Sequence, residues 1–142
     1  IRIFNLRQRI MDNYQAEIDN YIKENGLTEK VVYFGIAKPG KDLNELYNMA
    51  ELTVFMSKYE GFPLVILESL SSGTPAIVCL ERGLNFGDGC VNCKPDELSS
   101  IVEKMMGDSE TIEKLSLKSR ENVLNTYTWD IIAEKHFSNF KK

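Results

Sequence analysis

The sequence has few of the residues on which disulfide frameworks and metal sites depend. Its 142 residues include three cysteines and one histidine. Cys79, Cys90 and Cys93 are too few and too odd in number for a disulfide framework, which favours a reducing, cytoplasmic environment. Cys90 and Cys93 form a single C-x2-C pair, and a zinc site would need two further ligands, for which only Cys79 and His136 remain. We therefore expect neither a metal nor a cofactor.

Long apolar runs and clusters of positive charge are also missing. No run approaches the roughly 18 to 20 apolar residues that a membrane span needs, and no basic-then-apolar signal segment opens the chain. The formal net charge is -4 and Lys and Arg do not cluster, which argues against a nucleic-acid surface because phosphate neutralisation needs a basic stripe. These absences predict a soluble domain that does not bind nucleic acid.

Short apolar runs alternate with longer segments of helical period, and this alternation indicates βαβ units around a parallel sheet. The predicted strands are Ile1–Asn5, Val31–Gly35, Leu52–Met56, Ala76–Leu80 and Gly89–Val91. The predicted helices are Asp12–Asn25, Asp42–Ala50, Pro63–Gly73, Pro95–Met106, Ser109–Asn125 and Thr128–Phe140. The predicted fold is therefore α/β: a Rossmann-like, mostly parallel sheet with helices on both faces and a C-terminal helical tail, in one domain.

Particular residues mark the ends of these helices. Glycines 26 and 73 are predicted to end helices. Short polar side chains are predicted to cap helix N-termini, at Asp42, at Asp108 or Ser109, and at Thr128. Three aromatic residues are expected to anchor the last helix, either in the core or against a missing half of the protein: Tyr127, Trp129 and Phe137.

The segment after the third predicted strand has the features of an anion site. In open parallel sheets, ligands bind outside the carboxyl ends of the strands, where loops lead into helix N-termini. Here a loop from Ser57 to Phe62 leads into a helix that begins at Pro63, in its first turn. Pro63 lacks an N–H that would have no helical partner, and Gly61 permits close backbone approach or an unusual φ.

The first N–H groups of this helix lack helical acceptors. Together with a helix dipole of roughly half a positive charge, they form an anion site without a lysine. The N–H groups concerned are those of about Leu64, Val65 and Ile66. The segment therefore predicts a phosphate site.

Two glutamates bracket this predicted site. Glu60 precedes the helix, and Glu68 lies roughly 7 to 8 Å along the helix axis. Carboxylates accept hydrogen bonds from paired hydroxyls, so a sugar and a ribose on either side of a diphosphate would suit the spacing. The spacing alone is weak evidence in a chain with 21 acidic residues, because glutamates are mostly solvated surface charge.

The longer sequence around the two glutamates is more specific. It reads ELTVFMSKYEGFPLVILESLSSGTPAIVCL and resembles the Glu-x7-Glu region of retaining glycosyltransferases of the GT-B fold, the group 1 enzymes of family 4 type. The resemblance extends through LNELYNMAELTVFMS, PDELSSIVEKMM and NTYTWDIIAEKHF. It implies that residues 1–142 are a partial C-terminal, nucleotide-sugar-binding domain, one half of a GT-B fold, without the N-terminal acceptor-binding domain.

The resemblance implies roles for particular residues of the predicted site. Glu60 would be the catalytic residue in contact with the transferred sugar, and Glu68 would bind the ribose hydroxyls. Ile36, which follows the strand Val31–Gly35, falls where such enzymes hold the base. The remaining donor-binding residues would be Ser57 and the backbone of Gly61, Phe62, Pro63, Leu64 and Val65.

The sequence departs from the family at two places. In the family, an arginine and a lysine usually reach the diphosphate from an earlier strand, and we expect them to be missing from this sequence, which begins at Ile1. The common Gly-Gly-x-x-Glu loop is replaced by ERGLNFGDG, from Glu81 to Gly89. Lys38 and Lys41 are either substitutes for the missing cations or solvated surface residues.

The implied activity is metal-free transfer of a hexosyl group, with retention, from a nucleotide-diphosphate sugar to an acceptor on the missing domain. The implied setting is polysaccharide biosynthesis in the cytoplasm, at the inner face of a membrane contacted through the missing half. The chain alone is expected to bind donor weakly and not to turn over. The alternatives are a nucleotide-sugar epimerase or hydrolase of similar fold, and a non-catalytic nucleotide-sugar-binding domain. A receiver-type signalling domain is disfavoured because no acidic pair follows the first strand.

Overall fold

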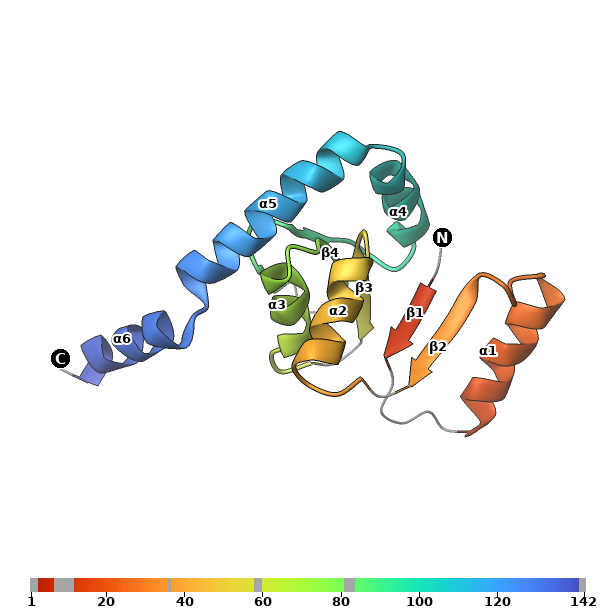
Figure 1. The fold of residues 1–142 in the computed structure, drawn as a ribbon, viewed down its shortest axis with the longest axis horizontal. Coiled ribbons are helices and arrows are strands. Elements are labelled where there is room, and N and C mark those ends of the chain that lie inside the picture. The colour runs from red at the N-terminus through yellow and green to blue at the C-terminus, as the bar shows by residue number, and fades with distance from the viewer. Residues whose placement is uncertain (1–2, 7–11, 36, 58–59, 81–83, 141–142) are drawn as a thin grey trace. The chain divides into compact units, whose positions relative to one another are not determined.

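The computed structural model describes residues 3–6, 12–35, 37–57, 60–80 and 84–140. Strands and helices alternate in the first part of the chain and only helices follow, as predicted (Figure 1). In chain order the elements are β1 (Ile3–Leu6), α1 (Asp12–Glu24), β2 (Val31–Gly35), α2 (Lys41–Met49), β3 (Thr53–Ser57), α3 (Leu64–Ser71), β4 (Ala76–Leu80), β5 (Cys90–Asn92), α4 (Leu98–Met106), α5 (Ser109–Thr126) and α6 (Trp129–Phe140).

The chain divides into two compact units, Ile1–Leu43 and Asn44–Lys142, and the boundary falls within α2. In the first unit, β1 and β2 pair in parallel with α1 as the crossover between them. Gly26 ends α1 as predicted: it has a φ of 64°, and its N–H donates to the Lys23 carbonyl at 3.1 Å. The next N–H, of Leu27, donates to the Ile22 carbonyl at 2.8 Å and completes a Schellman motif. The prediction of one domain over residues 1–142 stays a prediction.

The second unit is built around β4. Strands β3, β4 and β5 form a parallel sheet in that order, so β4 lies in the middle. Its residues from Ala76 to Cys79 are all buried, as expected for a central parallel strand with helices on both faces. Alternate residues of β4 point to opposite faces of the sheet. The predicted α/β architecture is therefore confirmed.

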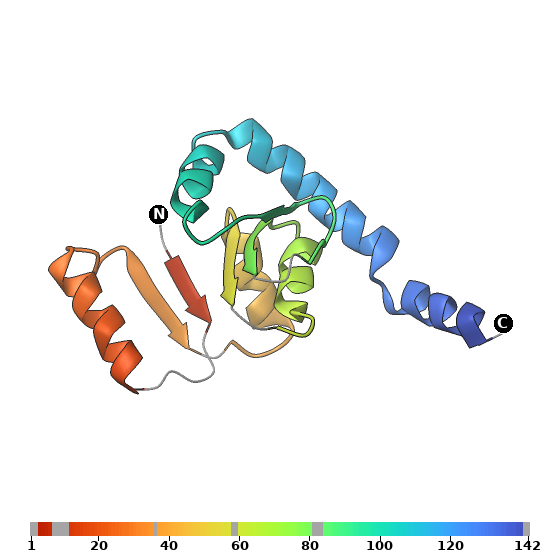
Figure 2. The same cartoon turned by 180° about the vertical axis from the view of Figure 1, so that it is seen from behind.

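Two hydrophobic clusters lie on the two faces of β4. Ala76 and Val78 pack with α3, whereas Ile77 and Cys79 pack with Met105 of α4. The long helix α5 contacts α4, α3 and α6, and Figure 2 shows its course from behind. The buried residues of the first cluster are Ile66, Leu70, Ala76, Val78, Phe86 and Val123.

Three predicted helix starts differ from the structure. The helix predicted from Pro95 is α4, which begins at Leu98 after the N-cap residue Glu97. Pro63 is the N-cap of α3, with φ -76° and ψ 98°, and not a first-turn residue, because proline fixes φ but leaves ψ free to be extended. Asp42 lies inside the first turn of α2, since Gly40, at φ 99°, turns the chain directly into a helix that begins at Lys41.

The other predicted caps are confirmed. Asp108 accepts a hydrogen bond from the Thr111 N–H at 3.0 Å, and Thr128 Oγ1 accepts one from the Ile131 N–H at 3.4 Å. Gly73 ends α3 in a Schellman motif at φ 81°, with its own N–H bonded to the Leu70 carbonyl at 3.0 Å. Both ends of α3 are therefore defined by local backbone geometry.

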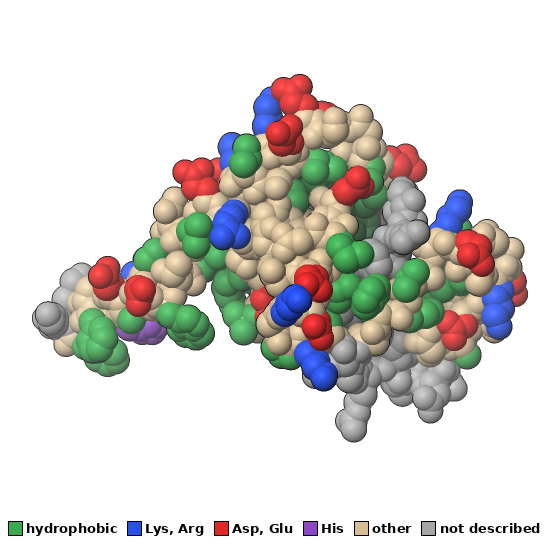
Figure 3. All heavy atoms as spheres, in the orientation of Figure 1, with side chains coloured by type: hydrophobic (Ala, Val, Ile, Leu, Met, Phe, Trp, Pro, Cys, Tyr) green, Lys and Arg blue, Asp and Glu red, His purple; other side chains and the backbone are tan. Residues whose placement is uncertain are grey.

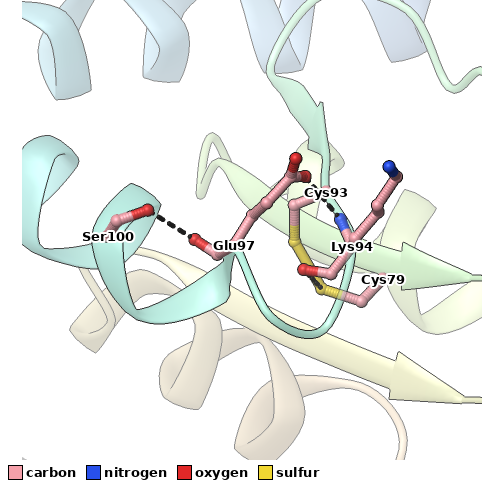
Figure 4. Close-up of a disulfide and its surroundings, with 5 residues drawn as sticks. All are labelled: Cys79, Cys93, Lys94, Glu97 and Ser100. Carbon is pink, nitrogen blue, oxygen red and sulfur yellow. Dashed lines mark hydrogen bonds between the residues drawn. A yellow bond between two sulfur atoms is a disulfide. The ribbon is translucent and has the colours of Figure 1, made fainter.

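The cysteines differ from expectation. Cys79 in β4 and Cys93, which directly follows β5, form a disulfide with their Cα atoms 5.1 Å apart (Figure 4). The N–H of Cys93 donates to the Val78 carbonyl at 3.0 Å and continues the ladder between β4 and β5, which brings the two thiols together. The expectation of reduced cysteines is therefore wrong for this pair, because the contact arises from strand pairing and not from sequence spacing.

Cys90, the other member of the C-x2-C pair, stays a free thiol. Burial raises the pKa of this thiol to about 11, although a backbone hydrogen bond involving Phe86 acts in the opposite direction. At neutral pH Cys90 is therefore protonated, and a protonated thiol is neither a good nucleophile nor a good metal ligand.

The last helix is not anchored in the core. No residue of α6 is buried, and Trp129 is 86% exposed, so the core position expected for Trp129 and Phe137 is wrong. Figure 3 shows hydrophobic side chains on the surface of this helix. Tyr127, which directly follows α5, does pack against the first hydrophobic cluster. None of the helices in the described part of the chain is both long and apolar enough to cross a membrane.

The loop before β5 packs tightly on α5, and this makes a testable prediction. Gly89 has a φ of 91°, and a Cβ there would lie 2.7 Å from Ser119 Cα. We expect Gly89→Ala to lower the free energy of unfolding by about 3 kcal/mol or more, because strain and a backbone clash add. Gly73→Ala is the control: φ is 81°, but the nearest atom is 3.5 Å away, so about 1 to 2 kcal/mol is expected. If urea denaturation shows equal losses of unfolding free energy for the two variants, the loop at Gly89 does not pack tightly against Ser119.

Candidate functional site

The candidate site lies at one edge of the sheet in the second unit. Ser57 ends β3 opposite Leu80 at the end of β4, so the carboxyl ends of both strands meet at this edge. Residues 60–63 lead from there into α3. The sequence prediction placed the phosphate site at this junction, and the structure brings the loop, the strand ends and the helix N-terminus together. Ile36, the predicted base-binding residue, lies outside the described residues.

The N-terminus of α3 offers backbone donors. Within the described residues, the N–H groups of Leu64 and Val65 donate no hydrogen bond to the protein, and Pro63 provides no side-chain cap. The N–H of Ile66 instead donates to the Pro63 carbonyl at 3.2 Å. The prediction that Ile66 is a free donor is therefore wrong, because the first turn of α3 tightens to an i to i+3 bond.

Gly61 leaves the approach to these donors open. Its φ is not positive, so the alternative of an unusual backbone angle is wrong. A Cβ at this position would meet nothing within 4 Å among the described residues. The remaining reason for a glycine is space in front of the backbone, which a ligand group could occupy.

The two glutamates have different surroundings. Both side chains are exposed. Glu68, however, accepts a hydrogen bond from the Tyr47 phenol, with Tyr47 Oη 3.3 Å from Glu68 Oε2. Among the described residues, the Glu60 carboxylate has no such hydrogen bond or ion pair to the protein. Glu68 therefore has an internal partner, and Glu60 faces solvent.

Tyr47 of α2 also reaches the site, although it was not among the predicted site residues. It is buried, and its phenol oxygen also lies 3.3 Å from the Val65 carbonyl oxygen. Burial, and secondly the charge of Glu68 and its hydrogen bond, raise the pKa of the Tyr47 phenol above its ordinary value. The signal that could have found this contact is the polar tip of a buried tyrosine, which usually requires a partner.

Phe62 anchors the loop before α3 through contacts with two other aromatic rings. Its ring centroid is 5.4 Å from that of Phe86 and 6.4 Å from that of Tyr127. Phe86 is fully buried, and its carbonyl accepts a hydrogen bond from Asn122 Nδ2 in α5. The next residue, Pro63, is buried as well. The loop is therefore anchored at Phe62 and Pro63, while Glu60 and Gly61 are exposed.

The described part of the chain contains no group of three or more His, Cys, Asp or Glu side chains that could hold a metal ion. The charged and polar groups described at the site include backbone N–H donors, two carboxylates, the Tyr47 phenol and Ser57. Such a set can bind a diphosphate through the N–H groups and hydroxyl groups through the carboxylates.

Comparison with known proteins supplies a family. The model of the family "Glycosyl transferases group 1" matches residues 5–85. An uncharacterised glycosyltransferase of Methanocaldococcus jannaschii is 30% identical over 123 residues, which is 82% of this chain and 31% of that protein. Mannosylfructose-phosphate synthase of Agrobacterium fabrum is 29% identical over 136 residues, 88% of this chain and 30% of the enzyme. The chain thus spans about a third of the length of these relatives.

A solved structure supplies the fold. The crystal structure of Anabaena HepE in complex with UDP and glucose matches with a TM-score of 0.82 and 16% sequence identity. The match covers 99% of this chain and 40% of HepE. At this identity the likeness shows a shared fold.

The anchoring of Phe62 makes the second prediction. Phe62→Ala removes two ring contacts from a half-exposed side chain, and we expect it to lower the free energy of unfolding by about 1 to 2 kcal/mol. The control is Leu117→Ala on α5, because Leu117 is 71% exposed and should change the stability by less than about 0.5 kcal/mol. Urea denaturation measures both, and equally small losses would show that the ring contacts do not hold the loop.

Proposed function

Because the chain belongs to the group 1 glycosyltransferases, we propose that it binds the nucleotide-diphosphate sugar donor of a retaining hexosyl transfer. The chain has the fold of one half of a GT-B glycosyltransferase. The acceptor is held by a further, N-terminal domain of the protein. The observation that carries the proposal is the N-terminus of α3, where two N–H groups that donate to no described residue lie between Glu60 and Glu68 in the sequence.

Each part of the donor meets a suitable group. The diphosphate binds the N–H groups of Leu64 and Val65, with Gly61 leaving space for it. The ribose hydroxyls bind Glu68, and the transferred sugar binds Glu60, the catalytic residue. Ser57 and the backbone of Phe62 and Pro63 complete the donor site, and Ile36 is the proposed contact of the base. That HepE is described in complex with UDP and glucose supports a donor of this class.

The chemistry rests on the same helix N-terminus. When the bond from the sugar to the diphosphate breaks, negative charge develops on the leaving diphosphate. Fixed N–H dipoles already aimed at that charge lower the barrier without reorganisation, and such groups typically contribute several kcal/mol, on the order of 3 per donor. We propose that these donors act without a metal or cofactor. The proposed cytoplasmic location, the contact with a membrane through the further domain and the role in polysaccharide biosynthesis rest on the family resemblance alone.

The two glutamates are expected to affect different steps. In the full-length protein, Glu68→Gln should weaken UDP binding about 10-fold, because one charge-assisted acceptor for the ribose is lost. Glu60→Gln should leave the dissociation constant for UDP within about 3-fold, because UDP lacks the transferred sugar, but should lower kcat by about 100-fold or more. Isothermal titration with UDP and a transfer assay measure the two effects.

Glu121→Gln serves as the matched control for this pair, since Glu121 is an exposed glutamate of α5. It should change neither binding nor turnover. Identical UDP titration curves for the Glu60 and Glu68 variants would refute the proposed division of roles.

The chain alone is expected to bind but not to transfer. It spans about a third of its relatives, and the proposal places the acceptor on another domain. Residues 1–142 should therefore unfold at a higher temperature in the presence of UDP, GDP or ADP, whichever nucleotide the site accepts. At a nucleotide concentration 100 times the dissociation constant, the free energy of unfolding should rise by roughly 2.7 kcal/mol. Residues 1–142 should release no sugar to an acceptor from UDP-glucose. Sugar transfer by this chain alone would disprove the proposal of a separate acceptor domain.

A further inference from the structure

The contact between Tyr47 and α3 joins a buried residue to an exposed one. Tyr47 is 4% exposed, whereas the side chain of Glu68 is exposed. A phenol has one proton to donate, and two acceptors lie at the same distance of 3.3 Å, Glu68 Oε2 and the Val65 carbonyl oxygen. Val65 and Glu68 are three residues apart on a helix, so they share a face and can meet the same phenol.

Both sides of this contact are held by other interactions. The Tyr47 carbonyl accepts a hydrogen bond from Thr74 Oγ1 at 2.7 Å, and Thr74 is itself buried. On α3, the buried Ser69 Oγ lies 2.8 Å from Thr53 Oγ1 and 2.9 Å from the Thr74 carbonyl oxygen. Thr74 therefore ties α2 and α3 to the same point, and the phenol oxygen has a fixed position relative to α3.

A fixed donor restricts a mobile acceptor. Glutamate is among the side chains with most rotamer freedom, and a surface glutamate samples many orientations of its carboxylate. Accepting a hydrogen bond at Oε2 restricts the carboxylate to orientations that keep this contact and leaves Oε1 available to other donors. Restricting a binding group before the ligand arrives reduces the entropy lost on binding.

The protonation state of Tyr47 suits a permanent donor. Burial, and then the nearby Glu68 charge, raise the pKa of the phenol above its ordinary value. The phenol therefore remains protonated throughout the neutral and mildly alkaline range. It can donate to the carboxylate at any pH at which the protein would be assayed.

We infer that Tyr47 is a positioning residue: its phenol holds the Glu68 carboxylate ready to receive the ribose hydroxyls of the nucleotide. This inference rests on the proposed function of Glu68 as the ribose contact. The same phenol touches Val65, whose N–H belongs to the proposed diphosphate site. Tyr47 thus ties the orientation of the ribose contact to the first turn of α3.

The test compares two nucleotides in the full-length protein. Tyr47→Phe keeps the ring and removes the donor. It should weaken UDP binding about 5- to 10-fold. The affinity for 2′,3′-dideoxy-UDP, which lacks the ribose hydroxyls that Glu68 is proposed to bind, should change less than 2-fold. Isothermal titration gives both dissociation constants. If Tyr47 has a purely structural role, Tyr47→Phe should weaken the binding of both nucleotides by the same factor. That result, or an unchanged affinity for UDP, would overturn the inference.

Two further variants make the result unambiguous. Tyr21→Phe removes an exposed phenol of α1 and should alter neither affinity. In a Glu68→Gln background, Tyr47→Phe should cause no further loss of UDP affinity, because the group it positions is already changed. An additional loss of the same size as in the wild-type background would overturn the inference. If Tyr47→Phe does not fold, Tyr47→Met, which fills a similar volume without a donor, takes its place.

Failure of the inference and failure of the proposed function give different results. If the wild-type protein does not prefer UDP over the dideoxy nucleotide, or if Glu68→Gln keeps that preference, then Glu68 is not the ribose contact and the inference falls with it. If Glu68→Gln abolishes the preference and Tyr47→Phe leaves it intact, the ribose contact stands and only the role of Tyr47 is refuted.

Discussion

Burial of β4 on both faces is the constraint on which the site depends. Because Ala76 and Val78 pack against α3 while Ile77 and Cys79 pack against α4, β4 must lie between two helical layers. Its parallel pairing with β3 then places Ser57 beside Leu80 at one edge. After β3, residues 60–63 lead from that edge into α3, whose Ile66 and Leu70 pack against β4, so the core of the second unit positions the N-terminus of α3. The donors of the site are thus positioned by residues that touch no ligand.

The sequence predicted the elements well because their periodicities are strong. The run Ala76–Leu80 is apolar throughout, and Gly26 and Gly73 each end a helix at a positive φ. What it could not predict depends on contacts between distant segments. The Cys79–Cys93 pair requires the ladder between β4 and β5, and the hydrogen bond of Tyr47 requires α2 to lie against α3. The prediction for the first turn of α3 was wrong for a local reason. Proline leaves ψ undetermined, and the Ile66 N–H donates a 3₁₀-type hydrogen bond to the Pro63 carbonyl.

The structure also gives different surroundings to the two glutamates, for which the family resemblance implies different roles. Each is exposed, and each is one of many acidic residues in the chain. Glu68 lies on a helix whose ends are both fixed, and it accepts a hydrogen bond from a buried donor. Glu60 lies in a loop that, among the described residues, is anchored at Phe62 and Pro63. A carboxylate with an internal partner suits the recognition of a group that does not move during transfer. A carboxylate without one can follow a sugar whose bonds change, which agrees with the proposed division between the ribose contact and the transferred sugar.

An acidic chain that binds a diphosphate must keep its carboxylates directed away from the phosphates. The formal charge is -4, and two like charges 4 Å apart in water repel by about 1 kcal/mol, and by more where solvent is partly excluded. In the proposed complex, uncharged N–H donors face the diphosphate, and Glu60 and Glu68 lie to either side of it. The hydrogen bond from Tyr47 holds Glu68 Oε2 beside the phenol and, in the proposed complex, leaves Oε1 for the ligand. The position of that phenol is therefore as relevant to tolerating the anion as to recognising the ribose.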